Sequence, residues 1–303
     1  MKKKSKLLGV LALFLIPQYL LQAQDEDLLK LVGGEEKQKK EIIKYAFKSP
    51  RVINSHSMEF LNPGTLDFRI LHRFGTLDKG YENFFGLDQA SMRMGFDYGI
   101  FRNLMAGVGR STYKKELDGY IKFAPILQST GPRSAPVTVA LVAGITMDGT
   151  PWADPSRKNF FTSRLAYYFQ CIIGRKFSEG FTLQVSPTMV HRNIVPLETD
   201  PNNVYALGLG GRLKLSKRLA FTWDYSHVLI GMPDSGYYHP LSLGVDIETG
   251  GHVFQLHFSN ATGMNERAFI TETTGQWGKG EIRFGFNLSR VFQVRKKHKA
   301  ARE

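Results

Sequence analysis

Cysteine is almost absent from this sequence, and long apolar runs are absent from all of it except the first residues. The single cysteine among 303 residues excludes an intrachain disulfide and any site built on several thiolates, such as an iron–sulfur cluster. After Ala23 no segment approaches the roughly 20 apolar residues of a transmembrane helix. What is present instead, 30 glycines and 12% aromatic residues, favours a large sheet with tight turns over a helical bundle.

The first 23 residues have the three parts of a secretory signal peptide. Four lysines between positions 2 and 6 precede an apolar stretch over residues 7–16, and Ala23 offers a small residue for cleavage. The apolar stretch is too short to span a bilayer, although an uncleaved helix is the alternative. We therefore expect residues 1–23 to be removed when a bacterium exports the protein.

From Thr65 onward, short segments alternate between apolar and polar residues. A period of two is typical of strands with one apolar and one polar face. Clear segments begin at Leu66, Met92, Leu165, Leu207, Phe221, Leu243 and Ile282, and weaker ones cover residues 104–112, 119–127, 137–146, 182–190 and 252–259. The sequence therefore predicts an all-β chain of about twelve strands, within a range of 10 to 14, with helical periodicity only before Pro50.

The alternation does not by itself say which face meets water. Twelve strands enclose an interior that apolar side chains would not easily fill. The connections alternate between short turns and long loops, and aromatic residues gather at strand ends, as in outer-membrane barrels. We predict a closed antiparallel transmembrane β-barrel over residues 57–294 in the bacterial outer membrane, with a basic periplasmic tail over residues 295–303. A secreted β-sandwich or solenoid is the alternative.

The two ends of the predicted barrel suggest partners besides the lipid of the outer membrane. The last strand is amphipathic, with Phe284, Phe286, Leu288 and Phe292, and we expect the barrel assembly machinery to recognise it. Residues 24–56 form a periplasmic arm with a helical pattern that Gly33-Gly34 interrupts and that resumes toward Lys44. This arm is predicted to plug the barrel mouth, to bind a periplasmic protein, or to remain a disordered lead-in.

One sequence element resembles a known family. The run from Phe47 to Asn54 leads through Ser57-Met58-Glu59 to residues 66–75, which contain His72-Arg73-Phe74-Gly75. Together with the closing strand over residues 280–292, this run resembles a Bacteroidota family of outer-membrane β-barrel proteins of unknown function. The resemblance implies a barrel fold and an outer-membrane location, and it transfers no catalytic residue.

The sequence offers no catalytic residue, no metal site and no cofactor site. Ser226 and His227 are neighbours in a predicted strand, so their side chains point to opposite faces and form no dyad. His252 and His257 also fall on opposite faces of one strand, which excludes them as a metal-binding pair. An outer-membrane enzyme is therefore the least favoured function.

Charged residues on the polar faces are the candidate functional residues. The predicted lumen-lining residues are Arg69, Arg73, Arg93, Asp97, Glu281 and Arg283, which closure of the barrel places on one arc. One interpretation is that such charges neutralise one another and stiffen the wall. The other is that three arginines against one glutamate near the outer end form a constriction that favours anions.

The charge balance fits export better than nucleic-acid binding. Removal of the signal peptide lowers the net charge from +13 to +9, and the tail over residues 295–303 carries +4 of the remainder. No nucleic-acid-binding motif lies beneath this charge. We predict a narrow channel or transporter for small solutes, with anions among the candidates, and the alternative is a non-conducting scaffold whose arm binds a periplasmic partner.

Overall fold

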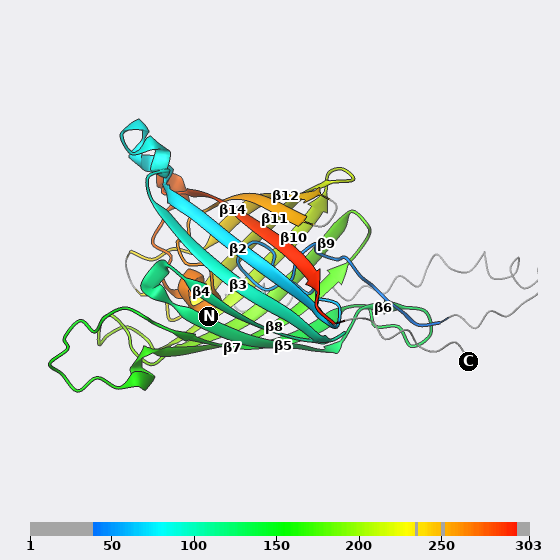
Figure 1. The fold of residues 1–303 in the computed structure, drawn as a ribbon, viewed down its shortest axis with the longest axis horizontal. Helices are drawn as coiled ribbons and strands as arrows, with labels where there is room; N and C mark the ends of the chain where they lie inside the picture. Colours follow the sequence, from blue (N-terminus) through cyan, green and yellow to red (C-terminus); the bar gives the residue numbers. More distant parts are fainter. Residues whose placement is uncertain (1–38, 234–235, 250–251, 296–303) are drawn as a thin grey trace, which may run out of the picture. The chain divides into compact units, whose positions relative to one another are not determined.

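Twelve strands close into an antiparallel barrel in the residues that the computed structural model describes, which are 39–233, 236–249 and 252–295 (Figure 1). Each barrel strand pairs with its neighbours in the chain, and β14 closes the barrel against β2. The predicted all-β barrel of about twelve strands is confirmed. The predicted signal peptide, residues 24–38 and residues 296–303 of the predicted tail lie outside the described residues.

The barrel strands are mostly eight to twelve residues long. They are β2 (Thr65–Thr76), β3 (Ala90–Phe101), β4 (Leu104–Ser111), β5 (Leu117–Ile126), β7 (Thr138–Met147), β8 (Leu165–Lys176), β9 (Phe181–Arg192), β10 (Asn203–Lys214), β11 (Leu219–Ile230), β12 (Leu241–Thr249), β13 (His252–Ser259) and β14 (Arg283–Gln293). The five weaker segments of the sequence correspond to β4, β5, β7, β9 and β13, which confirms them as strands.

The two ends of the barrel differ in the length of the connections between strands. The end at which β2 begins and β14 ends carries mostly short turns, such as the one between β3 and β4, and we name it the short-turn end. The opposite end carries the long connections and is named the loop end. Its short helices are η2 (Leu77–Lys79), η3 (Tyr81–Gly86), η4 (Tyr113–Lys115), η5 (Phe161–Arg164), α3 (Glu266–Thr271) and η6 (Trp277–Lys279). Among all the described residues, no helix has the length and apolarity that crossing a membrane requires.

Apolar side chains face outward along the barrel wall. Phe96, Val108, Ile121 and Phe169 are 48 to 60% exposed, whereas the residues beside them in each strand are buried. An exposed apolar surface that continues around the wall is the opposite of what a soluble sandwich presents, and it suits contact with lipid. The soluble alternative is therefore wrong.

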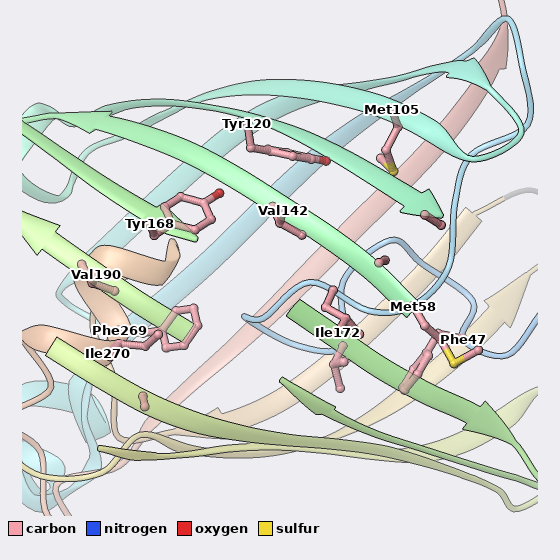
Figure 2. Packing of buried hydrophobic residues seen from close by; sticks show 14 of the residues in the cluster. Phe47, Met58, Met105, Tyr120, Val142, Tyr168, Ile172, Val190, Phe269 and Ile270 are labelled. Carbon is pink, nitrogen blue, oxygen red and sulfur yellow. The ribbon is translucent and has the colours of Figure 1, made fainter. Parts of the chain in front are cut away.

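Two segments of the chain fill the polar interior. We name residues 46–58 the N-terminal plug and residues 260–275 the loop plug, since most side chains of both are buried. Figure 2 shows Phe47 and Met58 of the first near Ile172 of the wall, and Phe269 and Ile270 of the second near Val190. Residues 46–56 of the predicted arm therefore lie in the barrel interior, as the plug alternative expects, and the fate of residues 24–38 stays a prediction.

The helix predicted to resume before Lys44 is wrong in the described residues. Residues 41 and 42 form β1 (Glu41–Ile42), which pairs with β6 (Ser129–Thr130) in a separate two-stranded sheet. The Ile43 amide also donates to the Gln128 carbonyl at 2.9 Å, so the backbone groups that a helix would use are paired across strands. The boundary predicted at residue 57 falls inside the plug, and the first barrel strand begins at Thr65.

The loop plug contains a helix that the sequence analysis did not predict. Asn265 precedes α3, and its side-chain oxygen accepts a hydrogen bond from the Ala268 amide at 2.9 Å. This is an N-cap, which satisfies one of the free amides at a helix start. All six residues of α3 are buried, so tertiary packing rather than an amphipathic pattern stabilises it.

Candidate functional site

Side chains of the barrel wall hold the backbone of the N-terminal plug. Gln184 of β9 accepts from the Met58 amide at 2.8 Å and donates to the His56 carbonyl at 2.7 Å. Gln255 of β13 donates to the Val52 carbonyl at 2.6 Å. The wall therefore supplies the hydrogen bonds that a non-helical buried backbone needs.

Asp224 on β11 anchors the turn at the tip of the plug. Its carboxylate accepts from the Asn54 amide at 2.9 Å, from the Ser55 amide at 2.8 Å and from the Ser55 hydroxyl at 2.9 Å. These three donors satisfy the buried carboxylate, and no cation in the described residues forms an ion pair with it.

The two plugs meet at an ion pair in the barrel interior. Arg51 donates to Glu266 at 2.9 Å, and both side chains are buried. Arg51 also donates to the Asn54 carbonyl at 2.7 Å, which links the ion pair to the plug turn. The His56 ring lies beside this pair, 4.3 Å from the ring centre of Tyr120 and 6.3 Å from that of Tyr168. The interior is therefore packed where the plugs touch.

Arg73, a predicted lumen residue, contacts both plugs. Its guanidinium donates to the carbonyls of Ala261 and Gly263 at 2.9 and 2.8 Å, and to the side-chain oxygen of Asn54. It also donates to the His257 ring at 3.3 Å. No carboxylate in the described residues forms an ion pair with Arg73. Arg73 therefore holds the backbone of the loop plug and the Asn54 side chain of the N-terminal plug.

The other charged residues predicted on β2 and β3 form ion pairs with the wall. Arg93 donates to Asp118 through two nitrogens, at 2.8 and 2.5 Å. Arg69 lies 2.5 Å from Asp67 and 3.8 Å from Asp97. These pairs match the interpretation in which lumen charges neutralise one another and stiffen the wall.

The last two predicted residues lie at the loop end of the same arc. Arg283 begins β14, in register with Thr76 of β2, and its side chain is half-buried. Glu281 lies just before the strand and accepts from the Gln276 amide at 2.8 Å. The structure thus places Arg73, Arg93 and Arg283 near one end, as expected. Their effect on ion selectivity stays a prediction.

A small cavity borders the middle of the N-terminal plug. A cavity of about 20 Å³ lies between the plug and the inner faces of β2, β13 and β14, lined by Arg51, Arg69 and Gln255 among others. A single water needs roughly 10 to 15 Å³, so this cavity has room for about one. Larger pockets of about 410 and 220 Å³ lie at the short-turn end and the loop end.

The residues at the centre of the lumen were not among those predicted from the sequence. Arg51, His56 and Glu266 lie outside the strands, and the period-two pattern that identified inward charges does not reach them. Asn265 ahead of Glu266 is the one local signal that could have indicated a short helix in the loop. In the described residues no group of three or more His, Cys, Asp or Glu side chains is placed to hold a metal ion.

Comparison with known proteins places the chain among membrane barrels. Residues 47–292 match the family model described as a membrane bound beta barrel domain (DUF5777). No curated protein sequence matches the chain significantly.

Several solved barrels share part of the shape. The NanC porin overlaps 75% of this chain and 98% of its own, with a TM-score of 0.47 and 8% identity. The match to the KdgM porin covers 75% of this chain and 99% of the porin, with a TM-score of 0.45 and 7% identity. The match to Omp33, an outer membrane protein of Acinetobacter baumannii, covers 75% of this chain and 98% of Omp33, with a TM-score of 0.40 and 9% identity. Because the sequence identities and the TM-scores are this low, the matches add nothing to what the strand pairing establishes.

Proposed function

We propose that this chain, which belongs to the family of membrane bound beta barrel domains (DUF5777), is an outer-membrane channel for small solutes. Its own plugs hold the channel closed. Conduction requires displacement of the N-terminal plug, residues 46–58. The loop end faces the outside and the short-turn end faces the periplasm, as in outer-membrane barrels. The assembly machinery that inserts such barrels would recognise β14.

One observation carries this proposal: side chains, and not strand pairing, hold the N-terminal plug in the lumen. Gln184, Asp224 and Gln255 bind its backbone, and each would be solvated by water if the plug left. The wall behind the plug includes the buried residues Thr182, Ser186, Thr222 and Asn287, which are polar too. A wall with these side chains suits a hydrated passage better than a permanently dry core.

Ion selectivity of the open form is part of the proposal. With the plug displaced, Arg73 would lose its contact with Asn54, and its charge would face the lumen without a carboxylate partner. Arg283 lies near the same end. Two cations that form no ion pair within the described part of the chain would favour anions in a narrow passage. Arg93 contributes less, because Asp118 neutralises it.

A bilayer recording tests the proposal. The full chain is compared with an Arg51→Ala/Asp224→Ala variant, in which the plug loses its ion pair and its anchor. We expect rare openings for the unaltered protein and at least tenfold more frequent openings for the variant. Lys48→Ala is the matched control. It also removes one positive charge from the plug, but Lys48 pairs with Glu248 at the partly exposed edge of the plug and not at the centre of the lumen.

A second function has support in the same contacts. The buried ion pair between Arg51 and Glu266 locks the two plugs together, which suits a non-conducting scaffold whose N-terminal arm binds a periplasmic protein. If hydrogen exchange shows that the plug of the variant is displaced while the bilayer stays silent, the channel is wrong and the scaffold is favoured. Affinity capture with and without residues 25–47 then identifies the partner.

A further inference from the structure

A pocket of about 220 Å³ opens at the loop end, and four loops contribute to it. Its lining is rich in charge: Lys114, Arg164, Arg192 and Arg267 are basic, and Asp148 and Glu272 are acidic. The loops are fixed to one another, since the Gly149 amide of one donates to the Lys114 carbonyl of another at 3.0 Å. The pocket is therefore a built feature rather than a gap between free loops.

Arg164 presents a charge that no carboxylate in the described residues neutralises. Its guanidinium donates to the carbonyl of Asp148 at 2.9 Å and to that of Thr150, and it stacks over the Trp152 ring at 3.9 Å. The Asp148 carboxylate is occupied elsewhere, because it accepts from the amide and the hydroxyl of Thr150. These contacts position the guanidinium without cancelling its charge.

Arg192 is the more unusual of the two arginines. It is only 3% exposed, and one of its terminal nitrogens donates to the Pro201 carbonyl at 2.8 Å. Its Nε has no hydrogen-bond partner among the described residues. No carboxylate in the part of the chain described here lies within ion-pair distance of it. Burial of a cation with an unsatisfied N–H costs free energy, and an anion in the pocket would remove that cost.

The remaining charges of the pocket are already shared among themselves. Glu272 lies 2.7 Å from Lys114 and 2.6 Å from Arg267. Arg267 is also paired with Glu116 at 2.6 Å. Because these groups satisfy one another, the excess positive charge is concentrated on Arg164 and Arg192.

We propose that this pocket binds a small organic anion, with its carboxylate or phosphate group against Arg164 and Arg192. Ile194 and Pro196 line the same pocket and would contact a short apolar portion of the ligand. The volume lies below the roughly 300 to 1,000 Å³ of sites for drug-sized ligands, which limits the ligand to a few carbons. That the anion is also a transported solute rests on the proposed channel function, whereas its binding does not.

Isothermal titration of the full chain in detergent tests the binding. The probes are butyrate, inorganic phosphate and n-butyl phosphate, with n-butylammonium as the probe of opposite charge. We expect saturable binding of n-butyl phosphate or butyrate, and no binding of n-butylammonium. Arg192→Gln and Arg164→Gln should each weaken binding at least tenfold. Arg157→Gln is the matched control, since Arg157 is exposed at the same end outside the pocket and its loss should change affinity less than twofold.

Three results would overturn the site. They are the absence of saturable anion binding to the unaltered protein, equal binding of n-butylammonium, and equal weakening by Arg157→Gln. Because Arg192 is buried, a thermal melt accompanies each variant, and the half-exposed Arg164 provides the test if Arg192→Gln does not fold. Phosphate and butyrate arms distinguish the two anion chemistries. Bilayer currents in the presence of the bound anion are scored separately, so a silent barrel that binds the anion contradicts the channel and not the site.

Discussion

Arg51 and Glu266 form an ion pair inside the barrel although 215 residues separate them in the chain. The first belongs to the N-terminal plug and the second to the helix of the loop plug, and 2.9 Å separates their charged atoms. Each plug is therefore held in part by the other. Displacement of either one would leave a buried charge without its partner, so the two are expected to move or to stay together.

Breaking this pair on one side should loosen both plugs. Removal of one partner of a buried ion pair costs about 3 to 5 kcal/mol, because the other charge stays buried and unpaired. We expect Arg51→Ala and Glu266→Ala each to accelerate hydrogen exchange at the Asn54 and Ser55 amides. The double variant Arg51→Met/Glu266→Leu should exchange more slowly than either single variant. Equal acceleration in all three would show that the ion pair does not couple the plugs.

Asp224→Asn should release the tip of the N-terminal plug. The substitution removes the negative charge and replaces one acceptor oxygen by a donor, so either the amides of Asn54 and Ser55 or the hydroxyl of Ser55 lose their acceptor. An unsatisfied buried polar group costs about 1 to 3 kcal/mol, so plug exchange should accelerate by one or two orders of magnitude. Exchange measured by mass spectrometry checks this, with Asp88→Asn in an exposed loop as the control. Unchanged exchange would mean that Asp224 is not the anchor.

Stability of the loop plug should fall in acid. Burial alone would raise the pKa of Glu272, but the charges of Arg267 and Lys114 outweigh it and lower this pKa from 4.5 to about 2. The Tyr113 hydroxyl donates to the same carboxylate at 3.0 Å. Because the folded pKa lies below the unfolded one, the stabilisation is present above about pH 4.5 and is lost as the pH falls toward 2.

The thermal unfolding midpoint between pH 6 and pH 2 measures this dependence. The shift corresponds to a free energy on the order of 3 kcal/mol, which Glu272→Gln should remove at neutral pH while it flattens the dependence in acid. Glu179→Gln is the control, since Glu179 is exposed at the opposite end of the barrel. An acid slope that survives Glu272→Gln would assign the effect to other carboxylates.

A methyl group at Gly144 should disturb the centre of the lumen. Gly144 pairs with Tyr168 across β7 and β8, and a Cβ there would overlap the Tyr168 ring. That ring contacts His56 of the plug, so its displacement is transmitted to the plug. We expect Gly144→Ala to lower the free energy of unfolding by about 1 to 3 kcal/mol. Gly119→Ala on β5 is the matched control, because its nearest neighbours would lie 3.7 and 3.8 Å from the new carbon. Equal effects at both positions would contradict the overlap.

The wall of the barrel was predictable because its signal is local. Residues such as Phe96 and Asp97 alternate along a strand, and this alternation separates the two faces of the wall. Loop lengths and strand number then assign the apolar face to lipid and the polar face to the lumen. The same rule placed Arg73, Arg93 and Asp97 inside, and barrel closure then brought Arg283 to their arc. Even the weaker strands were found, since a strand needs only a few residues of period-two pattern.

The contents of the lumen were decided only by the tertiary structure. The plugs have no repeating pattern, and their partners lie far away in the chain: Asn54 binds Asp224, and Arg51 binds Glu266. By itself, the sequence determined that this is a barrel with polar, charged inner faces. Which charges meet one another, and that Arg73 clamps two plugs instead of lining an open pore, depends on long-range contacts that local periodicity does not encode.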